Sequence, residues 1–176
     1  MSRCADTESS LDDAKKSREE LLAELRILRQ GRDSCEMALS ECKRIEGALT
    51  ERVKELDCLY GITRLAQNRD RPLPEMAGAI ADLIRASWQY PEVACARIIL
   101  DGTEYATPNF RRTRWRQAAP VTGRWEEGGQ VEVCYLEERP ASGEGPFLTE
   151  ERRLLDAVAD LVGRIVTQRR ADEQMR

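Results

Sequence analysis

The side chains of this 176-residue chain that could do chemistry are six cysteines and a local run of arginines, and the chain has no histidine. Without histidine there is no Ser–His–Asp or Cys–His relay, no phosphoacceptor histidine, and no histidine ligation of zinc or haem. No other nucleophile–base pair and no Gly-rich phosphate loop is evident from the residues. We therefore predict a non-catalytic protein without a kinase core, and the sequence indicates no cofactor and no metal site.

The cysteines are not spaced as a metal or redox motif. They are Cys4, Cys35, Cys42, Cys58, Cys95 and Cys134. No two of them form a C-x-x-C pair, and Cys35 and Cys42 are one heptad apart, which is a packing distance on a helix. We interpret Cys35 and Cys42 as thiols buried in a helical seam. In a parallel dimer each lies near its twin, so oxidation can link them, although cytosolic thiols normally stay reduced.

Arginines gather with aromatic residues in one short segment. The segment holds Phe110, Arg111, Arg112, Arg114, Trp115 and Arg116. Its chemistry suits an anionic ligand or a stacked nucleic acid, but a solvated loop beside acidic residues is the favoured interpretation. The formal net charge of −4 gives no general attraction to nucleic acid or to an anionic membrane, and we expect neither as a partner.

A further arginine stands in an otherwise apolar strand. Arg97 lies within the run 93–100, and a buried guanidinium must be paired. We predict a structural pair with a carboxylate, with a pocket floor as the alternative. Strand parity places Trp115 and Gln117 on one face, where Tyr105 and Arg97 could share a cavity with them. The candidate ligand-pocket residues are Arg97, Tyr105, Phe110, Trp115 and Gln117.

The element that must position the rest is a long helix with a repeat of 3.5 residues. The apolar register runs from residue 11 to residue 60 and is polar only at Arg18, Arg32 and Glu46. Such a long repeat is typical of a left-handed coiled coil, and Leu at position d favours two parallel strands. We therefore predict a homodimer. The predicted dimer seam contains Leu21, Leu25, Leu28, Cys35, Leu39, Cys42, Leu49, Val53 and Leu56.

The seam carries features that weaken it and features that fix its register. The polar residues all fall at position a, where they lower stability and help to set register. Gly31 costs about 1 kcal/mol against Ala in a helix. Across the dimer, Glu24 would pair with Arg29, opposite in sign. The alternative interpretation is a monomeric helical hairpin broken at residues 31–34.

Beyond the long helix, expected to end near residue 68, the pattern changes to that of an α+β domain. Pro74 opens a second helix, and Thr149 is the expected cap of a last helix with a wide apolar face. Asp101-Gly102 is a strong two-residue hairpin signal. Strands are expected at 93–100, 103–107, 117–125 and 131–136, in an antiparallel meander whose last strand alternates buried and exposed residues.

Several segments together resemble GAF domains of bacterial and archaeal sensor histidine kinases. The first of these segments, 51–62 (ERVKELDCLYGI), resembles the lead-in helix of such domains. WQYPE at 88–92, CARI at 95–98, VEV at 131–133, YLE at 135–137, GPFL at 145–148 and EER at 150–152 follow in order. The resemblance covers about residues 51–170. The tail 164–176 is similar to the linker that joins such a domain to a following PAS or kinase module.

The resemblance implies an α+β fold, with a GAF-like antiparallel sheet flanked by helices behind a long N-terminal coiled-coil helix. It divides the chain into a coiled-coil helix at 1–52, a GAF-like sensory domain at 53–167 and a helical linker at 168–176. Family members bind varied small molecules, among them cyclic nucleotides and linear tetrapyrroles. This chain lacks an N-K-F-D-E-type signature and a convincing chromophore cysteine, so the resemblance names no ligand.

We therefore expect a cytoplasmic, homodimeric sensory or regulatory module of a two-component-like signalling protein. It would relay a signal along its helices to a downstream PAS or histidine-kinase module or to a partner protein. The alternative is a structural or protein-interaction dimerisation module with a GAF-like fold and no small-molecule ligand. The sequence has no apolar run near 18 residues and no signal peptide, so no membrane contact is expected.

Overall fold

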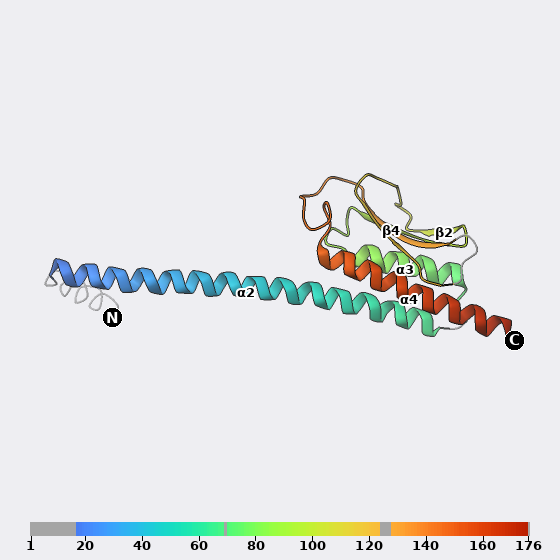
Figure 1. Cartoon of the computed structure of the whole chain (residues 1–176), viewed down its shortest axis with the longest axis horizontal. Coiled ribbons are helices and arrows are strands. Elements are labelled where there is room, and N and C mark those ends of the chain that lie inside the picture. Colours follow the sequence, from blue (N-terminus) through green and yellow to red (C-terminus); the bar gives the residue numbers. More distant parts are fainter. Residues whose placement is uncertain (1–16, 69, 124–127, 176) are drawn as a thin grey trace, which may run out of the picture. The chain divides into compact units, whose positions relative to one another are not determined.

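The computed structural model describes residues 17–68, 70–123 and 128–175 (Figure 1). The chain divides between Leu49 and Thr50 into two compact units. The sequence predicted a boundary after residue 52. Cys4, the predicted helix start near residue 11 and the predicted turn at 126–127 lie outside the described residues.

The long helix α2 spans Arg18–Gln67. A reciprocal cap fixes its start: the Glu20 N–H donates to the Ser17 hydroxyl at 3.3 Å, and the Ser17 N–H donates to the Glu20 carboxylate at 2.7 Å. The helix continues without a break through residues 31–34, so the alternative of a hairpin broken there is wrong. All described residues of the first unit, 17–49, are exposed, and this part of α2 buries no core of its own.

The second unit joins the end of α2 to two helices and a four-stranded antiparallel sheet. The elements are α3 (Leu73–Ser87), β1 (Ala94–Leu100), β2 (Thr103–Ala106), β3 (Arg116–Pro120), β4 (Gly129–Tyr135) and α4 (Thr149–Gln174). This is the α+β class expected from the sequence. The hairpin turn at Asp101 and Gly102 is confirmed, with φ of 48° and 74°, the left-handed values that a type I′ turn requires.

The strand order is β2-β1-β4-β3, so the predicted meander is wrong. β4 pairs with both β1 and β3, and it is central rather than at an edge. β3 ends at Pro120, which lies at a non-hydrogen-bonded position of the edge strand, because the Val121 N–H beyond it still donates to the Gly129 carbonyl at 2.9 Å. The predicted strand end at residue 125 lies outside the described residues.

This order leaves β2 and β3 at opposite edges of the sheet, and residues 107–115 must connect them. We call these residues the crossover segment. Its Arg111 carbonyl lies 3.6 Å from Cys95 Sγ, and its Thr113 hydroxyl donates to the Tyr135 carbonyl at 2.8 Å. The segment therefore passes over the face of the sheet that carries Cys95, which we call the outer face.

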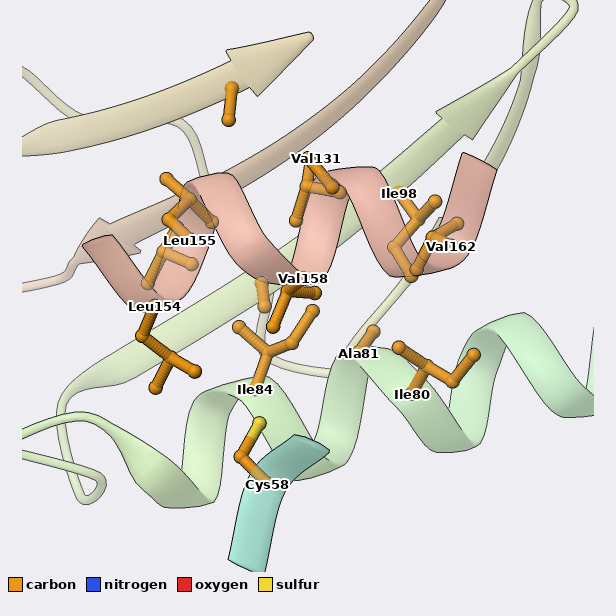
Figure 2. Packing of buried hydrophobic residues seen from close by; sticks show 14 of the residues in the cluster. Cys58, Ile80, Ala81, Ile84, Ile98, Val131, Leu154, Leu155, Val158 and Val162 are labelled. Carbon is orange, nitrogen blue, oxygen red and sulfur yellow. The ribbon is translucent and has the colours of Figure 1, made fainter. Parts of the chain in front are cut away.

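The opposite, inner face of the sheet is covered by α3 and α4 (Figure 1). Figure 2 shows side chains of both helices converging with Ile98 of β1 and Val131 of β4, while Cys58 of α2 packs beside Ile84 of α3. Packing is tight where α4 meets the chain after β3. A Cβ at Gly163 would lie 1.9 Å from the Thr122 carbonyl oxygen, so only glycine fits there.

Two local predictions are corrected. β4 does not alternate, because Val131–Tyr135 are buried on both faces, with α4 on one side and the crossover segment on the other. Thr149 is not the cap of α4, since the cap is Leu148. The Leu148 N–H donates to the Glu151 carboxylate at 2.8 Å, so a side chain from the first turn of α4 bonds the backbone of the cap residue.

Candidate functional site

The first candidate site is the apolar stripe along α2. Each leucine of the predicted seam in the first unit is exposed, from Leu21 at 37% to Leu28 and Leu49 at 63%. Cys35 and Cys42 are exposed free thiols in the same register. In the second unit, the α2 residues Val53 and Leu56 are also exposed. Large apolar side chains at heptad spacing are the surface that a second helix covers in a coiled coil.

The second candidate site lies on the outer face of the sheet and centres on Glu132. This carboxylate has 0% exposure and is surrounded by three guanidinium groups. Arg97 contacts it at 2.6 Å, and Arg112 and Arg116 each contact it at 3.2 Å. Arg97 also pairs with Glu104 at 2.7 Å, and its guanidinium lies 4.8 Å from the centre of the Phe110 ring. The prediction that Arg97 is paired with a carboxylate is confirmed.

The charges around Glu132 determine its protonation. Burial alone would raise the pKa of the Glu132 carboxyl, but the hydrogen bonds and charges of Arg97, Arg116 and Arg112 outweigh it. They hold the pKa of Glu132 below its usual range. The carboxylate therefore stays ionised at neutral pH and compensates the guanidinium of Arg97, which is only 14% exposed.

Next to this cluster, two thiols face each other across β1 and β4. Cys95 and Cys134 are Cα partners in the antiparallel register, and both are buried and free. Neither belongs to the apolar cluster under the helices. A hydrogen bond with the Cys134 thiol and the nearby backbone and charge of Arg111 lower the pKa of Cys95 to about 7, against the opposing effect of burial.

The crossover segment closes over the thiols through a few polar contacts. The Thr107 N–H extends the β1–β2 ladder to the Ala96 carbonyl at 2.9 Å. The Asn109 amide donates to the Ala94 carbonyl at 2.9 Å, and the Trp115 carbonyl accepts from the Tyr135 N–H at 2.9 Å. Between these anchors, the residues over the thiols make no regular strand.

The predicted ligand-pocket residues do not share one face. The register pairs Ile98 with Tyr105 and Val133 with Gln117, so Tyr105 and Gln117 lie on the inner face. Trp115 also packs against the apolar core. Arg97 and its stacking partner Phe110 lie on the outer face. The predicted cavity shared by Arg97 and Tyr105 is therefore wrong. Tyr105 is the partner of Ile98, and Ile98 and Arg97 are neighbours in β1 that point to opposite faces of the sheet.

The predicted arginine segment is divided among several roles. Arg112 and Arg116 reach Glu132, while Arg114 stacks on the Trp115 ring at 4.5 Å. Arg111 is exposed and contributes its backbone to the cover over Cys95. The segment is therefore partly structural rather than only a solvated loop.

A second buried carboxyl, Glu151, lies under the inner face. It accepts hydrogen bonds from the Gln89 N–H at 2.7 Å, the Leu148 N–H at 2.8 Å and the Tyr135 hydroxyl at 3.0 Å. Burial raises the pKa of the Glu151 carboxyl in spite of these bonds. Tyr135 in turn stacks on Phe147 with ring centres 4.5 Å apart. The arrangement fixes the start of α4 against β4.

The second unit also has a shallow surface groove of about 660 Å³ between the end of α2 and α3. Its apolar floor includes Leu65 and Leu83, and its rim carries Arg64, Asp82 and Arg85. Within the described ranges, no three acidic, cysteine or histidine side chains gather where they could hold a metal ion. Among the helices of those ranges, none combines the length and apolar character that a bilayer crossing requires.

Three residues of these sites were missed from the sequence: the facing pair Cys95 and Cys134, and the buried Glu132. Their positions follow from the pairing of β1 with β4, which are separated by two other strands along the chain. The mostly apolar run 93–100 and the alternation at 131–136 predicted two strands, but they did not predict that these strands pair. Compared with known proteins, the chain matches no family model, no curated protein and no solved structure.

Proposed function

We propose that this chain is a non-catalytic sensory or regulatory module of the GAF type that works as a parallel homodimer and relays a signal along its helices. The observation that carries the proposal is the exposed apolar stripe of α2 in unbroken heptad register. A helix this long with an unsatisfied seam is stabilised by a second helix rather than by its own turns. The polar a residues Arg18, Arg32 and Glu46 would make the pairing marginal enough to adjust.

The second unit supports a relay because it ties the end of α2 to α4. Cys58 and Ile62 of α2 are buried in the same apolar cluster as Leu155 and Val158 of α4. Near the far end of α4, the Arg169 guanidinium donates to the carbonyls of Ala66, Asn68 and Arg71. These carbonyls form the C-terminal end of α2 and the turn behind it. A shift of α2 would therefore move α4.

The test is the mass of the protein in solution, measured by sedimentation or native mass spectrometry. The particle in solution should have twice the 20.0 kDa mass of one chain. The double variant Leu28→Glu with Leu49→Glu, which places two charges in the seam, should be a monomer. The matched control is Met37→Glu with Ile27→Glu, two equally exposed apolar residues of the same helix that fall outside the seam.

The control variant should remain a dimer, because positions c and f of a heptad face solvent. A compact monomer for the parent chain would overturn the proposal. Dissociation by both double variants would place the contact elsewhere on α2. In the dimer, air oxidation should link Cys35 to its twin, and failure to link would exclude the parallel, in-register arrangement.

One observation favours a second candidate, a dimerisation or protein-interaction module without a small-molecule ligand. The inner face of the sheet is filled by the protein's own side chains, among them Ile98, Val131 and Val158 (Figure 2). Native mass spectrometry of freshly purified protein separates the candidates. A small molecule retained at a fixed stoichiometry favours the sensory module, and a bare dimer that binds another protein favours the interaction module.

A further inference from the structure

We propose that Cys95 and Cys134 are a modification site on the outer face of the sheet, where a small-molecule disulfide oxidises them to a disulfide across β1 and β4. This inference is independent of the dimer proposed for α2. It rests on the register of two central strands and on the segment that covers them. The site would record the thiol–disulfide balance around the protein.

The backbone geometry suits the bond. At the two ends of the β1–β4 ladder, the Leu136 N–H donates to the Val93 carbonyl and the Asp101 N–H donates to the Gly128 carbonyl. Counting inward in steps of two places Cys95 and Cys134 at a hydrogen-bonded position. Such partners have Cα atoms roughly 5.5 Å apart, within the usual range for a disulfide.

The side chains are also placed to react. Directly opposite residues of an antiparallel pair project to the same face, and the Cys95 thiol donates to the backbone carbonyl of Cys134 at 3.6 Å. Cys95 lies directly beneath the crossover segment, with its Sγ 3.6 Å from the Arg111 carbonyl, so lifting that segment uncovers Cys95 first. The pKa of Cys95 is also lowered and that of Cys134 raised, which agrees with Cys95 attacking first and Cys134 second.

The reaction is a double thiol–disulfide exchange. The Cys95 thiolate attacks one sulfur of the small disulfide, the S–S bond of that molecule breaks, and one small thiolate leaves. The Cys134 thiol then loses its proton and attacks Cys95 Sγ, and the second small thiolate leaves. The protein loses two electrons and two protons, and the small disulfide becomes two thiols.

Access to the pair is controlled by the crossover segment. Both thiols have 0% exposure in the closed structure, so the oxidant reaches Cys95 only when residues 107–115 lift. Two side chains of the segment bond the backbone of β1: the Asn109 amide donates to the Ala94 carbonyl, and the Thr107 hydroxyl accepts from the Ala96 N–H at 3.2 Å. Reaction therefore follows local opening rather than global unfolding.

The other cysteines provide internal comparisons. Cys58 is buried among apolar side chains, and burial raises the pKa of its thiol. Cys58 is as well buried as Cys95, with an exposed fraction of 1% against 0%. It lies on α2, and so it has no place in the register that sets Cys95 opposite Cys134. Cys35 and Cys42 are exposed and would link between copies. A Cys4→Ser, Cys35→Ser, Cys42→Ser chain keeps only the three buried thiols.

The experiment treats this triple variant with glutathione disulfide at pH 7.5, quenches with acid, and alkylates remaining thiols after denaturation. Peptide mass mapping should find the Cys95 and Cys134 peptides joined, while Cys58 is alkylated. The full six-cysteine chain should give the same joined peptide. Alkylation of Cys95 and Cys134 at the same fraction as Cys58, at every time point, would overturn the proposal.

Two further variants in the same background test the order and the cover. Cys134→Ser should stop the reaction at a mixed disulfide of glutathione on Cys95. Asn109→Ala should speed disulfide formation by up to about tenfold, because it removes one hydrogen bond that holds the cover. Gln168→Ala, which removes a side-chain amide hydrogen bond to Asp172 within α4, should leave the rate unchanged. Glutathione on Cys58 before Cys95, or equal rates for the two alanine variants, would contradict the mechanism.

Discussion

The two faces of the sheet each bury one carboxyl group, and they keep it in opposite ways. On the outer face, Glu132 is surrounded by guanidinium groups and its pKa is lowered. On the inner face, Glu151 accepts from two backbone N–H groups and a phenol, and burial raises its pKa. The same residue type therefore has its charged form favoured on one face and disfavoured on the other.

The difference shows what each face is built to do. The inner face is an apolar layer between the sheet and two helices, where polar groups serve to fix the start of α4. In the described part of the chain, the outer face is covered by the crossover segment, whose contacts are mostly ionic or polar. A layer held by ion pairs and a few hydrogen bonds opens at lower cost than a packed apolar layer. We expect changes of state in the second unit to begin on the outer face.

The largest predicted effect comes from removing the charge of Glu132. Glu132→Gln leaves the Arg97 guanidinium buried and only partly compensated by Glu104, and breaking a buried pair in this way costs about 3–5 kcal/mol. Arg112 and Arg116 are about half exposed and add little. Urea unfolding should report the loss in free energy of unfolding.

The matched control for this variant is Glu104→Gln. Glu104 also pairs with Arg97, but its side chain is 45% exposed, so its loss should cost under about 1 kcal/mol. Equal losses for the two variants would mean that burial does not distinguish these partners. The contrast between the two faces would then lose its electrostatic basis.

The sequence predicts the inner face much better than the outer face. Helical periodicity placed α2, α3 and α4, and Asp101-Gly102 placed the β1–β2 turn, because these signals depend on neighbours along the chain. The sequence also predicted that Arg97 is paired, since a guanidinium in an apolar strand requires it. It did not predict Glu132 as the partner. That partner comes from β4, and strand order depends on contacts between distant segments.

The same limit explains the two wrong predictions about faces. An alternating β4 would be correct for a sheet covered on one side, but the crossover segment covers the second side. The cavity shared by Arg97 and Tyr105 failed because hairpin register decides faces residue by residue. In β1, a polar residue that faces a covering loop has the same sequence signature as one that faces a pocket.

A smaller effect is expected from Glu151→Gln. The amide keeps one oxygen acceptor but turns an NH₂ group toward a backbone donor, and one unsatisfied buried donor costs about 1–3 kcal/mol. Tyr135→Phe is the control that removes only the phenol, with an expected cost of about 0.5–1.5 kcal/mol. Urea unfolding of both variants should show this order. A cost for Glu151→Gln as large as that for Glu132→Gln would indicate that Glu151 is an essential charge.

The smallest expected effect is a pH dependence. For each of Glu132→Gln and Glu151→Gln, the gap is the difference in free energy of unfolding between the parent and the variant, and the two gaps should change with pH in opposite directions. The lowered pKa of Glu132 adds stability above the ordinary carboxyl value of 4.5, and this stability is lost as the pH falls through the folded-state value. The gap between the parent and Glu132→Gln should therefore narrow below pH 4.5. The raised pKa of Glu151 acts in the other direction.

Stability from Glu151 is fully present below pH 4.5 and is lost as the pH rises through its folded-state value. The gap between the parent and Glu151→Gln should therefore widen on acidification, and the change should occur above pH 4.5 rather than below it. Urea unfolding from pH 3.5 to pH 7.5 measures both gaps in one series. Two gaps that narrow together on acidification would mean that both carboxyls are held as charges, and that the two faces differ only in what covers them.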